Sequence, residues 1–324
     1  MKKRNYSPLL LILLLLLLAG CAVKPKTAVT KSPVIGFSQS GTESSWRKFH
    51  TKSIRTELKR DNYEVMYRNG YQNQERQIQD VRTFIAYQVD LIILAPLTEH
   101  GWEPVLKEAK KAKIPVVVVD RHLEVNDQSL YLTHISSSFK AEGQRAGLYV
   151  TNHFAKSKQR QIKILELNGT ADASAAKLRQ EGFADTIGRD PRAHITATIN
   201  GDFTRAKGEE VMADYIKNHD LSQIDVLFSH SDEMTLGALK AIKQTKIRPG
   251  KDLIIVTVDA QENMIRKLQV GEVNCVVECN PDAGWYVVNA LNRYFAGQQV
   301  PHEIYMPETT FSESNADKVP TRNY

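Results

Sequence analysis

Short apolar runs alternate with amphipathic segments along most of this 324-residue chain, from Pro33 onward. The runs are rich in β-branched residues, which is typical of strands, whereas the segments between them carry apolar residues at helical spacing, as at Phe49, Ile54 and Leu58. This alternation indicates parallel sheets covered by helices on both faces. The sequence therefore predicts an α/β protein with strands at residues 34–37, 63–67, 91–94, 116–119, 162–167, 195–199, 226–228 and 253–258.

Eight such units are compatible with one (β/α)₈ barrel or with two open, doubly wound domains. Polar residues follow the first four strands (SQSG, NG, APLT and DR), and the last four strands repeat the pattern (NGT, NGDF, SHSD and Asp259). Ligands of open parallel sheets bind beyond the carboxyl ends of the strands. The repeat favours two half-sites that face each other across a hinge, although a barrel would also place these loops together on one rim.

The start of the chain differs from the rest. Basic residues at positions 2–4 precede an unbroken apolar run over residues 9–19, which is too short for a membrane span of about 20 helical residues. This order is typical of an export signal. The string LAGC, which ends at Cys21, resembles a bacterial lipobox, in which the chain is cut before a lipidated cysteine. We expect a signal peptide over 1–20 and a lipidated Cys21; a plain signal peptide with an incidental cysteine is the alternative.

Much of the basic charge belongs to this signal. The net charge is +6 for the whole chain and +3 without residues 1–20. Residues 21–32, rich in Lys, Pro, Thr and Ser, predict a flexible tether. Nucleic acid is not an expected partner of an exported protein, and the lysines at 107–113 share a helical segment with Val105 and Leu106, which indicates a solvated face.

Sequence motifs of common enzymes are incomplete or absent. The chain has no GxGxxG, Walker A, HExxH or paired CxxC motif, and its nine histidines are scattered. The string GFSQS at 36–40 nearly matches the hydrolase motif G-x-S-x-G but lacks its final glycine. Cys275 and Cys279 would lie about 13 Å apart on one extended strand, too far for a disulfide. We therefore expect no enzymatic activity, no cofactor, no metal and two free thiols.

Six short motifs occur in order: VIGFSQ (34–39), ESSWR (43–47), GWEPVLKEA (101–109), VDR (119–121), GDFTRAKG (201–208) and DEMTLGA (232–238). Together they resemble periplasmic sugar-binding proteins of bacterial ABC importers, and in particular the galactofuranose-binding members. The resemblance implies two Rossmann-like lobes joined by a three-segment hinge, the type I periplasmic-binding-protein fold, which closes on its ligand. The expected lobes are 33–136 plus 280–302 and 137–279 plus 303–324.

A sugar presents hydroxyl groups and apolar faces, which suit charged bidentate side chains and aromatic walls. From the residues alone, Asp120 and Arg121 are equally well a ligand pair or a structural ion pair; the resemblance implies ligand contact. The ligand-binding set that it implies is Glu43, Ser44, Ser45, Trp46, Arg47, Asp120, Arg121, Arg179, Asp202, Phe203, Ser231 and Asp259.

Three positions carry further expectations. Trp46, at a helix start, is poorly placed for burial, which favours stacking on the sugar over core packing. Trp102 fits lobe packing or the cleft edge equally. Asp232 fits a helix cap better than a ligand contact.

The family commonly has Asn where this chain has Ser231, and Asp-Asn where it has Ser138 and Phe139, which leaves the identity of the sugar open.

The expected partners are a monosaccharide and an ABC permease with its ATPase subunits, with the chain acting as a monomer anchored at the periplasmic or envelope surface by its lipidated cysteine. A sugar receptor that presents its ligand to a sensor kinase or chemoreceptor is the competing function. A cytosolic repressor of the same fold would need a helix-turn-helix where this chain has a signal.

Overall fold

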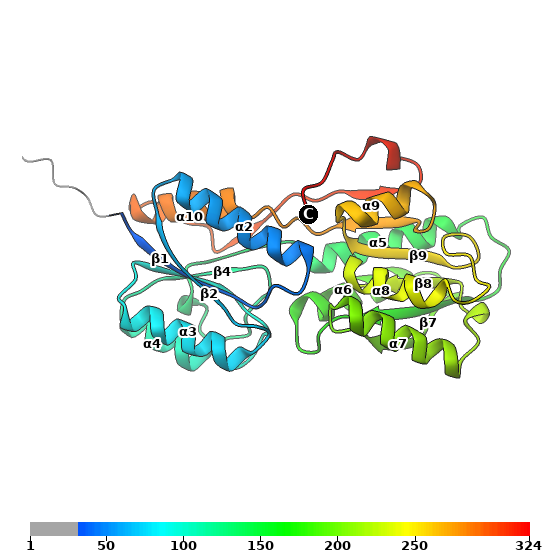
Figure 1. Ribbon diagram of the computed structural model, residues 1–324, viewed down its shortest axis with the longest axis horizontal. Helices are drawn as coiled ribbons and strands as arrows, with labels where there is room; N and C mark the ends of the chain where they lie inside the picture. The colour runs from blue at the N-terminus through cyan, green and yellow to red at the C-terminus, as the bar shows by residue number, and fades with distance from the viewer. Residues whose placement is uncertain (1–31) are drawn as a thin grey trace, which may run out of the picture. The chain divides into compact units, whose positions relative to one another are not determined.

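Two six-stranded sheets organise the described residues, 32–324, of this computed structural model (Figure 1). The predicted signal peptide, Cys21 and nearly all of the predicted tether lie outside these residues. The first sheet has the order β11-β5-β4-β3-β1-β2 and the second β12-β10-β9-β8-β6-β7. Both are open sheets, which confirms the two-domain interpretation and excludes the barrel. No helix of residues 32–324 has the length and apolar character needed to cross a membrane.

The first sheet and its helices form the first lobe. Its strands are β1 (Val34–Gln39), β2 (Glu64–Asn69), β3 (Leu91–Ala95), β4 (Val116–Val119), β5 (Thr133–Ser136) and β11 (Glu303–Tyr305), all paired in parallel. Its helices are α2 (Ser45–Arg60), α3 (Gln74–Ala86), α4 (Glu103–Lys111) and α10 (Gly284–Phe295). Leu91 and Ile93 of β3 pack in the cluster under α2 and α10, whereas Ile92 and Leu94 pack under α3 and α4. This period of two follows from the pleat of a strand.

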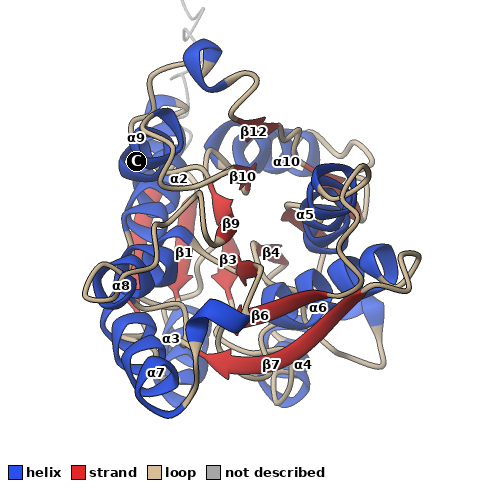
Figure 2. Cartoon of the chain, turned by 90° about the vertical axis from the view of Figure 1, so that its right-hand side faces the viewer, coloured by secondary structure: helices blue, strands red, loops and turns tan. Residues whose placement is uncertain are grey.

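The second lobe repeats this arrangement. Its strands are β6 (Ile162–Asn168), β7 (Ala193–Asn200), β8 (Val226–Ser229), β9 (Ile254–Asp259), β10 (Cys275–Glu278) and β12 (Thr310–Ser312), of which only β12 pairs antiparallel. Its helices are α5 (Phe139–His153), α6 (Ser174–Ile187), α7 (Arg205–Asn218), α8 (Asp232–Ile242) and α9 (Glu262–Gln269). Figure 2 shows α5 and α6 on one side of these strands and α7 and α8 on the other.

All eight predicted strands are present, each within two residues of its expected ends. The short strands β5 (THIS), β11 (EIY) and β12 (TFS) were not predicted from the sequence, because polar residues interrupt their three or four positions, whereas the equally short β4 (VVVV) is apolar throughout. One lobe boundary also differs from the expectation. Residues 303–305 were expected in the second lobe, but β11 pairs with β5 of the first sheet, so the third crossing follows Tyr305.

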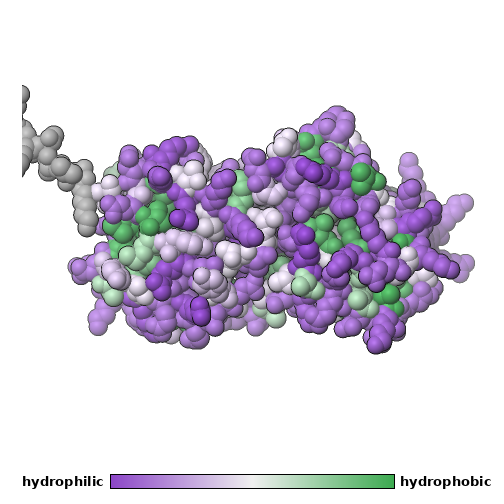
Figure 3. All heavy atoms as spheres, viewed as in Figure 1, coloured by the Kyte–Doolittle hydropathy of each residue, from purple (hydrophilic) through white to green (hydrophobic). Residues whose placement is uncertain are grey.

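The surface is mostly hydrophilic on the face drawn in Figure 3, with apolar side chains in small patches. The lysines on and after α4 are exposed while Val105 and Leu106 are buried, as the sequence predicts. Trp102 is fully buried and its Nε1 donates to the Thr98 carbonyl oxygen, so it packs the first lobe and does not border the cleft.

Candidate functional site

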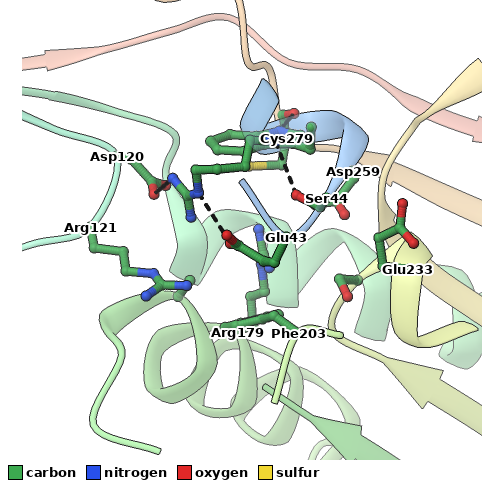
Figure 4. A pocket seen from close by; sticks show the side chains of 13 residues that line it. Glu43, Ser44, Asp120, Arg121, Arg179, Phe203, Glu233, Asp259 and Cys279 are labelled. Atoms are coloured by element: carbon green, nitrogen blue, oxygen red, sulfur yellow. Dashed lines mark hydrogen bonds and ion pairs between the residues drawn. The ribbon is translucent and has the colours of Figure 1, made fainter. Parts of the chain in front are cut away.

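A pocket lies where loops from both sheets meet at the carboxyl ends of their strands, as expected for doubly wound sheets. It holds about 400 Å³ of empty space, counting the open solvent at its mouth. Figure 4 shows the side chains that line it. They are Glu43, Ser44, Trp46, Arg47, Asp120, Arg121, Ala175, Arg179, Phe203, Ser231, Glu233, Asp259 and Cys279.

The first-lobe wall is a charged network around Arg47. The Ser44 hydroxyl caps α2 by accepting from the Arg47 backbone N–H, which places the Arg47 side chain in the first turn. Arg47 Nη1 donates to Asp120 Oδ2 at 2.5 Å, and Arg47 Nε donates to Glu43 Oε1 at 3.3 Å. Burial raises the pKa of Glu43, but the positive charges of Arg47 and Arg121 help to bring it below its ordinary value, so this carboxylate stays charged.

Arg121 adds a second cation beside this network. Its Nη1 donates to the Leu97 carbonyl oxygen at 2.5 Å, and its guanidinium lies 5.4 Å from the centre of the Phe203 ring. Burial and the nearby charge of Arg47 lower the pKa of Arg121 to about 10. A desolvated guanidinium of this kind is suited to bind acceptor groups of a ligand in a planar, bidentate geometry.

Arg179 projects from α6 on the second-lobe side. Its Nε donates to Glu142 Oε2 and its Nη1 to the His230 carbonyl oxygen, both at 2.6 Å. The position depends on close packing of α5 against α6, because a Cβ on Gly143 would overlap the Arg179 carbonyl oxygen. Arg179 is therefore held by its backbone and by two hydrogen bonds.

Asp259 ends β9 and faces the pocket with a carboxylate that burial disfavours. Its Oδ2 accepts from the Asp232 backbone N–H at 3.2 Å. Burial raises the pKa of Asp259 to about 7, even though Arg179 and Arg47 oppose that rise. The Asp232 carboxyl, which accepts from the Gln261 backbone N–H, has a pKa raised well above its ordinary value by burial and by Asp259. The two carboxyls therefore hold a proton near neutral pH.

Three pocket residues adopt left-handed backbone conformations that non-glycine residues rarely adopt. The φ angles are 67° at Asp120, 54° at Phe203 and 124° at Asp259. Such conformations cost about 1–3 kcal/mol each and are concentrated at functional sites. Each residue follows or ends a strand, so the strain aims a side chain from the sheet edge into the pocket.

Trp46 lines the pocket but is buried, with 6% of its surface exposed, so the expectation that it is poorly placed for burial is wrong. Its Nε1 donates to the Cys279 carbonyl oxygen at 2.7 Å, and its ring stacks on His50 at 5.0 Å between ring centres. This burial could not be predicted from the local sequence, because the Cys279 carbonyl lies 233 residues further along the chain.

Ten of the twelve predicted site residues line the pocket. Ser45 lies outside it, near Phe49 and Tyr324, and Asp202 is exposed with its side chain outside the lining. Ser231, not Asp232, caps α8, by accepting from the Met234 backbone N–H at 3.4 Å. Ala175, Glu233 and Cys279 also line the pocket but were not in the predicted ligand-binding set; the motif DEMTLGA contains Glu233 and was the available signal.

The chain crosses between the sheets three times beside this pocket. The crossings follow β5, β10 and β11, and they bring Ser137, Cys279 and Glu308 together. Cys279 Sγ lies 3.5 Å from Ser137 Oγ, and Arg145 Nη2 donates to Glu308 at 2.6 Å. Cys275 and Cys279 are both free and buried, as the sequence predicts. The Phe139 ring packs against the guanidinium of Arg179, 5.3 Å from the ring centre.

Known proteins resemble this chain over most of its length. A profile of the periplasmic binding protein domain matches residues 35–299. The galactofuranose-binding protein YtfQ of Escherichia coli (strain K12) is 36% identical over 94% of this chain and 98% of its own. The arabinose ABC transporter binding component of Shewanella sp. ANA-3, solved with α- and β-L-arabinofuranose, is 41% identical, with a TM-score of 0.83 over 88% of this chain and 93% of its own. A Mycobacterium smegmatis protein solved with β-D-fucofuranose is 36% identical, with a TM-score of 0.85 over 89% and 93%.

Proposed function

The chain belongs to the periplasmic binding protein domain family, and from that premise we propose that it captures a monosaccharide in its furanose form and delivers it to an ABC permease. The observation that carries the proposal is that both lobes contribute charged side chains to one small pocket. Arg47, Asp120 and Arg121 line one side, and Arg179 and Asp259 line the other.

The chemistry of the pocket suits a small polyol. Each sugar hydroxyl both donates and accepts, so it can bridge a carboxylate and a guanidinium. Phe203 offers an apolar face of the kind that packs against sugar C–H groups. The buried guanidinium groups of Arg47 and Arg179 are already paired with the carboxylates of Asp120 and Glu142, so a neutral ligand with many hydroxyls adds hydrogen bonds without adding an unpaired charge.

A five-membered ring is supported by the relatives. The two solved structures cited above contain arabinofuranose and fucofuranose, and the Escherichia coli relative is named for galactofuranose. Ser231 is shorter than the Asn common in the family and lacks its amide donor. We expect this position to admit a bridging water or a different hydroxyl pattern.

Binding is tested by calorimetry and thermal denaturation with a panel of L-arabinose, D-galactose, D-fucose, D-ribose and D-fructose. A ligand at about 100 times its Kd stabilises the folded state by about 2.7 kcal/mol. Asp259→Ala and Asp120→Ala should abolish the stabilisation. Asp202→Ala is the matched control, because Asp202 is exposed and outside the pocket. If none of the sugars raises the melting temperature of the unaltered protein, the proposal fails.

We also propose that the two lobes close on the sugar by rotation about the three crossings, with the lobe boundaries after Ser136, Cys279 and Tyr305. Small-angle scattering with and without a sugar that binds tests the motion. A decrease in the radius of gyration on binding is expected, and an unchanged radius would contradict closure.

Cys21 is proposed to carry the lipid that anchors the protein in the cell envelope. The support is the LAGC string after an export signal. Cys21→Ala should move the protein from the membrane fraction to the released fraction, and retention of the variant in membranes would count against the anchor. A pull-down with sugar-loaded protein separates transport from signalling: recovery of permease subunits supports delivery, whereas recovery of a kinase alone overturns it.

A further inference from the structure

His134, on β5, uses both of its ring nitrogens. Nε2 lies 2.9 Å from the Asp120 carbonyl oxygen, and Nδ1 lies 2.9 Å from Glu303 Oε2. A carbonyl oxygen can only accept, so Nε2 carries the hydrogen. In the neutral ring Nδ1 then presents a lone pair, and it faces a carboxylate oxygen that also only accepts. Two acceptors at this distance require a cation between or beside them, either a proton or a metal ion.

His122 lies against this pair. Its ring centre is 4.1 Å from that of His134, and the planes are inclined by 56°. The backbone N–H of His122 donates to Ser174 Oγ, but neither of its ring nitrogens has a hydrogen-bond partner within residues 32–324. If His134 and Glu303 formed only an imidazolium–carboxylate pair, both ring nitrogens of His122 would remain without a hydrogen-bond partner among the described residues.

We propose that His122, His134 and Glu303 form a site for a divalent transition-metal ion of the Zn²⁺ class. Each residue offers one ligand atom, and these atoms all lie within 4.8 Å of one another. Two imidazoles and one carboxylate are a common zinc donor set, which leaves a fourth position for water. The bond from His134 Nε2 to the Asp120 carbonyl oxygen is the outer contact that typically fixes the tautomer of a metal-bound histidine.

The charges around the cluster favour a metal ion over a competing side chain. No Lys or Arg of the described chain forms an ion pair with Glu303, whose side chain is 36% exposed and open to an ion from solvent. The cluster of Glu142, Cys279 and Glu308 differs, because Arg179 and Arg145 already pair with its two carboxylates. In a third cluster, of Glu99, His100 and Glu124, Lys177 Nζ lies 3.9 Å from Glu99 Oε2. Among these three clusters of the described residues, the cluster at His122 is therefore the one without an ion pair to Lys or Arg.

The three ligands come from neighbouring strands, since β4, β5 and β11 lie side by side at one edge of the first sheet. His122 follows β4, His134 is within β5 and Glu303 begins β11. A bound ion would tie the three-residue strand β11 to the segment that carries Asp120. This edge strand is short and leads into the third crossing, so a bound ion would stabilise the position of β11 where the crossing begins.

Metal binding is tested on the full chain, purified without a histidine tag and stripped with EDTA. Titration with ZnCl₂ in a calorimeter should give one high-affinity ion per chain, and CoCl₂ should give the visible absorption bands of a low-symmetry Co²⁺ site. His122→Ala and Glu303→Gln should each weaken Zn²⁺ binding by roughly 10- to 100-fold or more. His194→Ala, at an exposed histidine of β7, should bind as the unaltered protein does, and Mg²⁺ should not compete.

The alternative is a proton shared by His134 and Glu303. In that case Zn²⁺ produces no stoichiometric heat, or Glu303→Gln binds it with unchanged affinity, and either result overturns the metal site. Thermal denaturation of each variant without metal keeps the test valid, since Glu303 and His122 are only partly buried and their substitution is expected to leave a folded protein.

Discussion

Arg47 Nη1 lies 2.5 Å from Asp120 Oδ2, with each side chain only 6% exposed. This contact joins the first turn of α2 to the end of β4, 73 residues further along the chain. Burial lowers the pKa of Arg47, but Asp120 and Glu43 raise it by more, so the guanidinium remains charged. The pair holds one wall of the pocket in place within the protein itself, which lowers the ordering cost of binding a ligand.

Asp120→Asn should lower the free energy of unfolding by about 3–5 kcal/mol, because it leaves buried Arg47 without its closest counter-ion. Urea denaturation measures the change. Glu108→Gln is the matched control, since the Arg82–Glu108 pair is 43% exposed on both sides and should contribute less than about 1 kcal/mol. Equal losses in the two variants would contradict the role assigned to the buried pair.

Gly169→Ala should weaken sugar binding by displacing Phe203. A Cβ at Gly169 would overlap the Phe203 ring, which lies over this glycine and lines the pocket. Calorimetry on the single and double variants separates this effect from a general loss of stability. In a Phe203→Ala background the clash is absent, so Gly169→Ala should cause little further loss of affinity. Additive losses would show that the two positions act independently.

The carboxyl pair of Asp232 and Asp259 should make the ligand-free protein less stable as pH rises from about 4 to about 7. Burial raises both pKa values in the folded state above the ordinary value of about 3.9, so the folded state holds more protons across this window. The free energy of unfolding then falls with rising pH, by at most about 1.4 kcal/mol per pH unit for each extra proton. Arg47 and Arg179 oppose the shift and Glu233 adds to it.

Urea denaturation of unaltered protein and of Asp232→Asn at several pH values checks this slope. The variant removes one of the two carboxyls whose pKa is raised in the folded state, so the folded state holds fewer extra protons in this window and the slope should flatten. Other groups titrate in both proteins, and the comparison between them removes their contribution. The same slope in both would show that the pair does not share its proton in the folded state.

Cys275 and Cys279 should resist thiol reagents in the folded protein. Both are buried, and burial raises the pKa of each thiol, which suppresses the reactive thiolate. In a Cys21→Ala background, a thiol-reactive dye should label no cysteine before denaturation and two afterwards. Fast labelling of a folded sample would contradict the burial, and fewer than two thiols in urea would indicate a disulfide.

The sequence predicted the residue types of the site better than their contacts. The loops after the parallel strands were predicted to border the site, because the carboxyl ends of such strands share one edge. Within those loops the family resemblance implied Asp120, Phe203 and Asp259, and all three line the pocket. Ser45 was included through its neighbours in the motif, but on a helix adjacent residues point about 100° apart. Ser45 therefore faces away from the side of α2 that carries Trp46 into the pocket.

The α/β class, the eight main strands and the polar loops follow from the amino-acid sequence, since they depend on local periodicity and turn chemistry. Three features became apparent in the folded chain: the strands form two open sheets, β11 belongs to the first of them, and Trp46 is buried against the Cys279 carbonyl. These facts depend on contacts between segments distant in the chain. Their free energy comes from burial and pairing in three dimensions, which local patterns do not encode.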